Sequence, residues 1–133
     1  MSAERGTIRV ASAEIQREGR YLVTQRSPTA VLPLLWEFPG GRVRDGEDDR
    51  EALRRTVRHR LGVAVDVRDR VLEVRHEYPE YVVVLVVYRC LIEQGEPAPN
   101  AVNALAWVAP DEFADYPFPG ADQRTVELLL REI

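Results

Sequence analysis

The sequence predicts an α/β fold in which a mixed β-sheet lies between two helices, within a single domain of residues 1–133. Residues 81–88 are apolar throughout, which is typical of a strand covered on both faces. Residues 48–62 and 122–133 repeat apolar residues at helical spacing, so each helix should bury one face. Strands are expected before, between and after these helices, and this order predicts a sheet covered by a helix on each side.

Alternation of apolar and polar residues, together with glycine and proline turn signals, predicts the strands and loops. Arg17-Glu18-Gly19-Arg20 is typical of a hairpin turn between two strands, and the two prolines of residues 27–33 indicate a loop. Pro39-Gly40-Gly41 indicates a turn in which glycine lets the backbone approach a ligand closely. The expected strands are residues 7–16, 21–26, 34–38, 64–76, 81–92 and 105–108, with a short helical turn at 110–115.

The two helices are predicted by capping residues and by apolar spacing. Asp48 stands at the expected N-cap of the first helix, and Glu51 three residues later completes a capping box. Gly62 is expected to end this helix. The buried faces should consist of Leu53, Val57 and Leu61 in the first helix and of Val126, Leu129, Leu130 and Ile133 in the second.

Composition and charge restrict the class of protein. The net charge of −4 and pI near 5.3 leave no broad basic surface, so we expect no nucleic-acid partner. The longest apolar run, residues 81–88, is far too short to cross a bilayer, and no signal peptide is expected. Cys90 is the only cysteine and should be a buried strand residue. These features predict a cytoplasmic protein without a membrane partner.

The most specific pattern begins with Leu35-Trp36-Glu37-Phe38-Pro39-Gly40-Gly41 and ends at Val63. It resembles the signature of the Nudix superfamily, in which Gly, five residues, Glu and seven residues precede Arg-Glu-apolar-any-Glu-Glu-any-Gly-apolar. The first seven residues are most similar to the MutT and CTP-pyrophosphohydrolase branch, which hydrolyses nucleoside triphosphates to monophosphates. The resemblance implies the family's α/β/α sandwich, with the mixed sheet between the signature (box) helix and a C-terminal helix. The matching signature positions are Gly41, Glu47, Arg55, Val57, Gly62 and Val63.

Three signature positions differ from the family. Thr56, His59 and Arg60 stand where the family has glutamates, and their spacing places them on one helix face. In the family these carboxylates hold Mg²⁺, a hard cation that prefers oxygen ligands. The replacement changes the charge of that face by about four units, which should prevent Mg²⁺ binding. A further family ligand lies in the loop before the strand that contains Trp107, where alignment gives Ala101 and no carboxylate.

The retained pair of Glu47 and Arg55 favours the fold more than turnover. In the family this contact braces the loop against the helix, and such pairs are commonly structural. His59 is a candidate general base, although a single histidine on a helix face is more often solvated.

The resemblance also implies a nucleotide site. Arg26 would lie near the nucleotide, Glu37 and Phe38 would border the base pocket beside Gly40, and Asp122 would hydrogen-bond the base edge. An aspartate accepts from exocyclic amino groups, which suits cytosine or adenine. Arg26 as a solvated strand end, and Asp122 as the N-cap of the last helix, are the structural alternatives. The two tryptophans, Trp36 and Trp107, should lie in the core or at its margin.

Three functions follow from these expectations. The first is a catalytically silent or very weak Nudix protein that binds a nucleotide, with Arg42, His59 and Arg60 contacting phosphate and no cofactor. The alternative is an active (d)NTP pyrophosphohydrolase that uses Mg²⁺ and displaced acids. A protein-interaction module is the second alternative. The candidate displaced acids are Glu47, Asp49 and Glu51.

Overall fold

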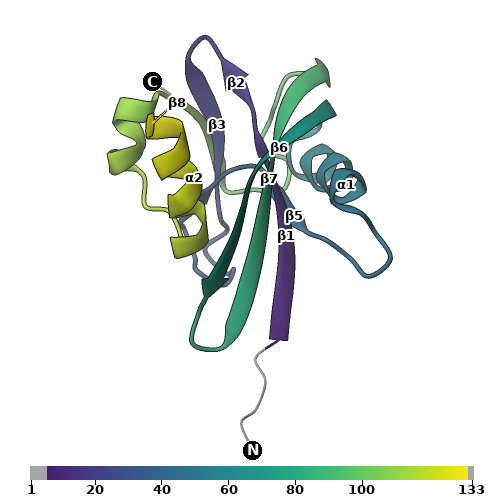
Figure 1. Cartoon of the computed structure of the whole chain (residues 1–133). Helices are drawn as coiled ribbons and strands as arrows, with labels where there is room; N and C mark the ends of the chain where they lie inside the picture. Colours follow the sequence, from purple (N-terminus) through teal and green to yellow (C-terminus); the bar gives the residue numbers. More distant parts are fainter. Residues whose placement is uncertain (1–5, 132–133) are drawn as a thin grey trace, which may run out of the picture.

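The computed structural model describes residues 6–131. Within these residues, five strands precede the first helix, and three more separate it from the C-terminal helices (Figure 1). The elements are β1 (Gly6–Glu14), β2 (Gln16–Arg17), β3 (Arg20–Gln25), β4 (Trp36–Glu37), β5 (Gly40–Arg42), α1 (Asp49–Leu61), β6 (Ala64–Glu77), β7 (Tyr81–Gln94), β8 (Ala104–Val108), η1 (Pro110–Asp115, a 3₁₀-helix) and α2 (Gly120–Arg131).

The strands form two sheets rather than one. The first has the order β5-β1-β7-β6 and is mixed, because β1 and β7 are parallel while the outer pairs are antiparallel. The second consists of β2, β3 and β4, with β8 also paired to β3. Helices α1 and α2 lie on opposite sides of the first sheet (Figure 1). The predicted mixed sheet between two helices is confirmed, and the second sheet was not anticipated.

Helix α1 has the caps that the sequence predicts. The side chain of Asp48 accepts a hydrogen bond from the backbone N–H of Glu51 at 2.8 Å. At the other end Gly62 adopts a left-handed φ of 73°, and its N–H donates to the carbonyl oxygen of Arg58. The three apolar residues of the predicted stripe pack fully buried against the first sheet: Leu53, Val57 and Leu61. Local sequence therefore determines how α1 begins, ends and faces the core.

The residues from 34 to 42 differ from the prediction. Strand β4 covers only Trp36–Glu37, and Gly40 and Gly41 belong to strand β5 instead of a turn. Gly40 pairs with Ser12 and has a φ of 150°, and a Cβ there would collide with the carbonyl oxygen of Ala11. Glycine at this position therefore permits a close approach between two strands.

The buried face of α2 also differs from the prediction. Leu130 is 42% exposed, so its expected place in the core is wrong, and Ile133 lies outside the described residues. Val126 is half-buried and packs beside the buried Leu129. The inward face also carries polar residues, because Asp122 and Thr125 are buried with Ala121 and Leu129.

The remaining predictions about the core are confirmed. Cys90 is 1% exposed, and burial raises the pKa of its thiol to about 12, so the group stays protonated. Trp36 and Trp107 are half-buried at the core margin, where Trp36 meets Tyr116 edge-on at 5.0 Å. The guanidinium of Arg17 lies 4.5 Å from the Trp107 ring. Within residues 6–131, neither the length nor the apolar character of any helix suffices to cross a membrane.

Candidate functional site

A cavity of about 520 Å³ lies between strands β1, β5 and β7 of the first sheet, strand β4 and the start of α2. Strands β1 and β7 contribute apolar side chains to it, including those of Val10 and Leu85. Seven of the eight residues predicted to contact the nucleotide or its phosphates line it together: Arg26, Glu37, Phe38, Gly40, Arg42, Arg60 and Asp122. The fold thus brings the predicted nucleotide-binding residues from three separate parts of the chain to one cavity.

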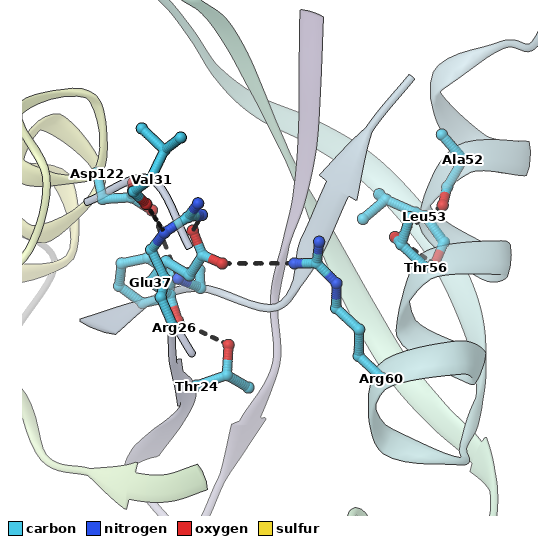
Figure 2. A network of polar contacts seen from close by, with 10 residues as sticks. Thr24, Arg26, Val31, Glu37, Ala52, Leu53, Thr56, Arg60 and Asp122 are labelled. Atoms are coloured by element: carbon cyan, nitrogen blue, oxygen red, sulfur yellow. Dashed lines mark hydrogen bonds and ion pairs between the residues drawn. The ribbon is translucent and has the colours of Figure 1, made fainter. Parts of the chain in front are cut away.

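Glu37 is held between two arginines in the wall of this cavity (Figure 2). Its Oε2 accepts a hydrogen bond from Nη1 of Arg26 at 3.0 Å, and its Oε1 lies 3.4 Å from Nη1 of Arg60. Nε of Arg26 also donates to the carbonyl oxygen of Val31 at 2.7 Å. Arg26 is therefore paired with Glu37 and only partly solvated, and its contact with a nucleotide stays a prediction.

Asp122 is a buried acid that lines the same cavity. Its Oδ1 accepts a hydrogen bond from the backbone N–H of Phe38 at 3.4 Å. Burial, with a smaller effect from the negative charge of Glu37, raises the pKa of Asp122 to about 8. Helix α2 begins at Gly120, so Asp122 lies inside the first turn and the alternative of an N-cap is wrong. At pH 7 the carboxyl group is mostly protonated and can both donate and accept.

The three altered signature positions of α1 have three different environments. Oγ1 of Thr56 donates to the carbonyl oxygen of Ala52 at 2.8 Å, and the side chain packs beneath Gly41. His59 is exposed and does not line this cavity or a smaller one beside it. Arg60 alone reaches the cavity, where it meets Glu37 (Figure 2). A phosphate group in the cavity would therefore meet Arg60 without His59.

The donor set on this face does not suit the Mg²⁺ ion that the family resemblance implies. A hydroxyl already bonded within its helix, an exposed imidazole and a guanidinium replace hard anionic oxygens. Among residues 6–131, no three His, Cys, Asp or Glu side chains gather as a metal site.

Two of the three candidate displaced acids, Glu47 and Asp49, are engaged elsewhere. Both oxygens of Glu47 accept hydrogen bonds from Arg55, at 2.7 and 2.8 Å, and these bonds lower the pKa of Glu47 to about 2. Asp49 accepts from Arg9 at 2.7 and 2.8 Å and from the hydroxyl of Tyr88 at 2.8 Å. The Glu47–Arg55 contact is the brace that the resemblance implies.

A second cavity of about 120 Å³ adjoins the first. Arg26, Glu37 and Arg60 line both cavities, so these three side chains form a shared wall. Ala101, at the loop position expected for a further metal ligand, is exposed and lines the smaller cavity.

Sequence reasoning missed part of the lining. The alternation of β1 places Ile8, Val10 and Ser12 on one face, and this signal was present in the sequence. Tyr78 lies in the turn between β6 and β7, and Tyr81 begins β7. The hydroxyl of Tyr78 accepts a hydrogen bond from the backbone N–H of Ala121 in α2, a contact that depends on tertiary packing.

A cavity lined by aromatic residues, a buried acid and three arginines suits a ligand that combines a flat polar ring with an anionic group. Residues 10–128 match the NUDIX domain. The chain therefore belongs to the Nudix family.

Two relatives and two solved structures indicate the branch. The chain is 32% identical to the CTP pyrophosphohydrolase of Escherichia coli K12 over 123 residues, which cover 92% of this chain and 91% of that protein. It is 34% identical to the putative 8-oxo-dGTP diphosphatase 2 of Mycobacterium tuberculosis H37Rv over 127 residues, which cover 93% and 89%. The solution structure of the E. coli ORF135 protein has a TM-score of 0.80 at 30% identity, with 96% and 91% coverage. The MutT protein of Methanosarcina mazei Go1 has a TM-score of 0.84 at 24% identity with 98% coverage of both chains, which supports the fold alone.

These comparisons confirm the Nudix superfamily, its MutT and CTP-pyrophosphohydrolase-like branch, and the α/β fold. Both relatives are named for hydrolysis of a nucleotide, and neither name indicates an inactive protein. The expectation of a silent site thus receives no support from them, and they favour the alternative of an active pyrophosphohydrolase.

Proposed function

We propose that this protein binds a nucleoside triphosphate in the larger cavity and hydrolyses it weakly or not at all with Mg²⁺. The observation that carries the proposal is the position of Arg60, whose guanidinium reaches the cavity wall from a signature position of α1. A guanidinium there contacts phosphate oxygens directly and repels a metal ion.

The base would lie against Phe38 and Asp122. Phe38 lines this cavity, and its buried ring stacks on Phe118 at 5.5 Å, so the lining at this residue is held in place. A protonated Asp122 presents one donor and one acceptor side by side. This pair matches the amino group and adjacent ring nitrogen of cytosine, and CTP and dCTP are therefore the first ligands to examine.

The electrostatics of α1 oppose Mg²⁺. One unit charge at ~4 Å contributes about 4 kcal/mol at an effective dielectric constant of ~20, and a divalent ion doubles the effect. Even after several-fold screening, the change from three carboxylates to a neutral side chain, an exposed histidine and Arg60 removes most of the attraction.

Isothermal titration with EDTA present tests this function. We expect CTP or dCTP to bind with a dissociation constant below about 1 mM, because base and phosphate contacts need no metal. GTP, ATP and UTP provide the comparison for base preference. Failure of every nucleotide to bind in this range would contradict the proposal.

An active (d)NTP pyrophosphohydrolase is the second candidate, favoured by the hydrolytic relatives that match nine-tenths of the chain. It would need Glu47, Asp49 or Glu51 as displaced acids, although the first two already bind arginines. Release of phosphate or pyrophosphate with Mg²⁺ and with Mn²⁺ separates the candidates. Rapid turnover of any nucleoside triphosphate would replace the first proposal with this one. A cytoplasmic location stays a prediction under both.

A further inference from the structure

The Arg26–Glu37–Arg60 triad places one carboxylate between two guanidinium groups that come from different elements. Arg26 follows β3, Glu37 belongs to β4, and Arg60 lies on α1. The side chain of Glu37 is 17% exposed, against 26% for Arg26 and 32% for Arg60. All three groups are thus only partly shielded from water, and the triad carries an excess of one positive charge.

The two ion pairs of the triad differ in how firmly they are held. The Arg26–Glu37 distance is 3.0 Å, and Arg26 is also anchored to the carbonyl oxygen of Val31. The Arg60–Glu37 distance is 3.4 Å, near the limit of a hydrogen bond. The contact between Arg60 and Glu37 is therefore the one that a stronger acceptor would break first.

The triad also lies at the boundary between the two cavities, within reach of an anionic group of a bound ligand. Its three residues form the wall shared by the two cavities, with Phe38 and Asp122 on the side of the larger one. A ligand whose ring lies beside Asp122 would extend its anionic end toward this wall. Phosphate and carboxylate oxygens accept from guanidinium groups in the same way, so they compete for the same donors.

We propose that Glu37 occupies, in the free protein, the place that a phosphate group takes between Arg26 and Arg60. The carboxylate is a built-in competitor: a phosphate displaces it from Arg60, and the opened wall joins the two cavities around the phosphate chain. This inference rests on the proposed function for the nature of the ligand, and it assigns the phosphate contact to Arg26 and Arg60 rather than to His59.

Glu37→Gln tests the competitor role, because it keeps the shape of the side chain and removes its charge. Calorimetry with EDTA would use three probes: inorganic triphosphate, CTP and cytidine. We expect the variant to bind triphosphate and CTP about tenfold more tightly, while cytidine, which lacks phosphate, changes by less than about twofold. Equal or weaker binding of triphosphate by the variant would overturn the inference.

A matched control and a second variant make the result specific. Glu96→Gln is the matched control, because Glu96 also forms an ion pair with an arginine and lines neither cavity. Oε1 of Glu96 lies 2.9 Å from Nη1 of Arg17, and the substitution removes the same charge. It should leave all three affinities unchanged. Arg60→Gln should weaken triphosphate binding. In this background, Glu37→Gln should tighten triphosphate binding by a smaller factor than it does in the wild type. Equal gains in both backgrounds would overturn the role of Arg60.

The probes also separate this inference from the nucleotide function. Tighter triphosphate binding by Glu37→Gln, with no binding of any nucleotide, would support the anion site and contradict the nucleotide function. Equal CTP binding by wild type and variant would support the nucleotide function and contradict the competitor. Absence of anion binding by both proteins would overturn both.

Discussion

Asp122 shows how much a single residue depends on its surroundings. Its sequence position suggested either a base contact or a helix cap, and the structure places it inside the first turn of α2, facing Phe38. It is 7% exposed, and its pKa of about 8 means that a neutral acid, rather than the carboxylate expected from sequence, would meet the base. Burial by distant segments causes this change, so no local pattern predicts it.

The raised pKa of Asp122 predicts how stability depends on pH. The folded protein keeps a proton that the unfolded chain, with the ordinary value of 3.8, has already released. The stabilisation is therefore complete below pH 3.8 and declines as pH rises toward about 8. Asp122→Asn removes this dependence, so from pH 5 to pH 9 its thermal midpoint should fall less than that of the wild type, by several degrees. Parallel curves for the two proteins would show that Asp122 titrates normally.

At the scale of elements, helix α1 was predictable because its ends are chosen by local residues. The caps at Asp48 and Gly62 and the buried stripe all follow from short-range spacing. Strand β5 was not predictable from local residues, because Gly40 and Gly41 join the first sheet by pairing with β1, about thirty residues earlier in the chain. A Pro-Gly-Gly sequence alone cannot distinguish a turn from such a close strand pairing.

The cap at Gly62 yields a stability prediction for the end of α1. Gly62→Ala forces a side chain into a left-handed φ of 73°, which costs about 1–2 kcal/mol. The new Cβ would also lie 2.7 Å from Nδ2 of Asn100, so that side chain must move. Urea unfolding should show this loss.

Gly46→Ala is the control, since Gly46 has a similar φ of 80° and open space around it. Gly46→Ala should lower the free energy of unfolding only by the cost of the left-handed backbone, and therefore by less than Gly62→Ala does. Equal losses would mean that Asn100 adapts without cost.

Across the whole molecule, the fold of the family is kept while the side chains at its metal-binding positions are changed. The NUDIX match over residues 10–128, the two sheets and the Glu47–Arg55 brace preserve the fold, while three positions of α1 alter the charge of one helix face. The sequence predicted both facts, because fold and signature are readable from spacing. It did not predict where Arg60 points, since the Glu37–Arg60 pair joins residues on different elements.

We propose that side chains on α1, rather than the fold, suppress metal-dependent hydrolysis in this protein. The most direct measurement compares pyrophosphate release from CTP with Mg²⁺ by the wild type and by a variant carrying Thr56→Glu, His59→Glu and Arg60→Glu. We expect Mg²⁺-dependent release to be much faster with the triple variant than with the wild type, because three carboxylates again share one helix face. Release by the wild type at a rate equal to that of the variant would contradict this proposal.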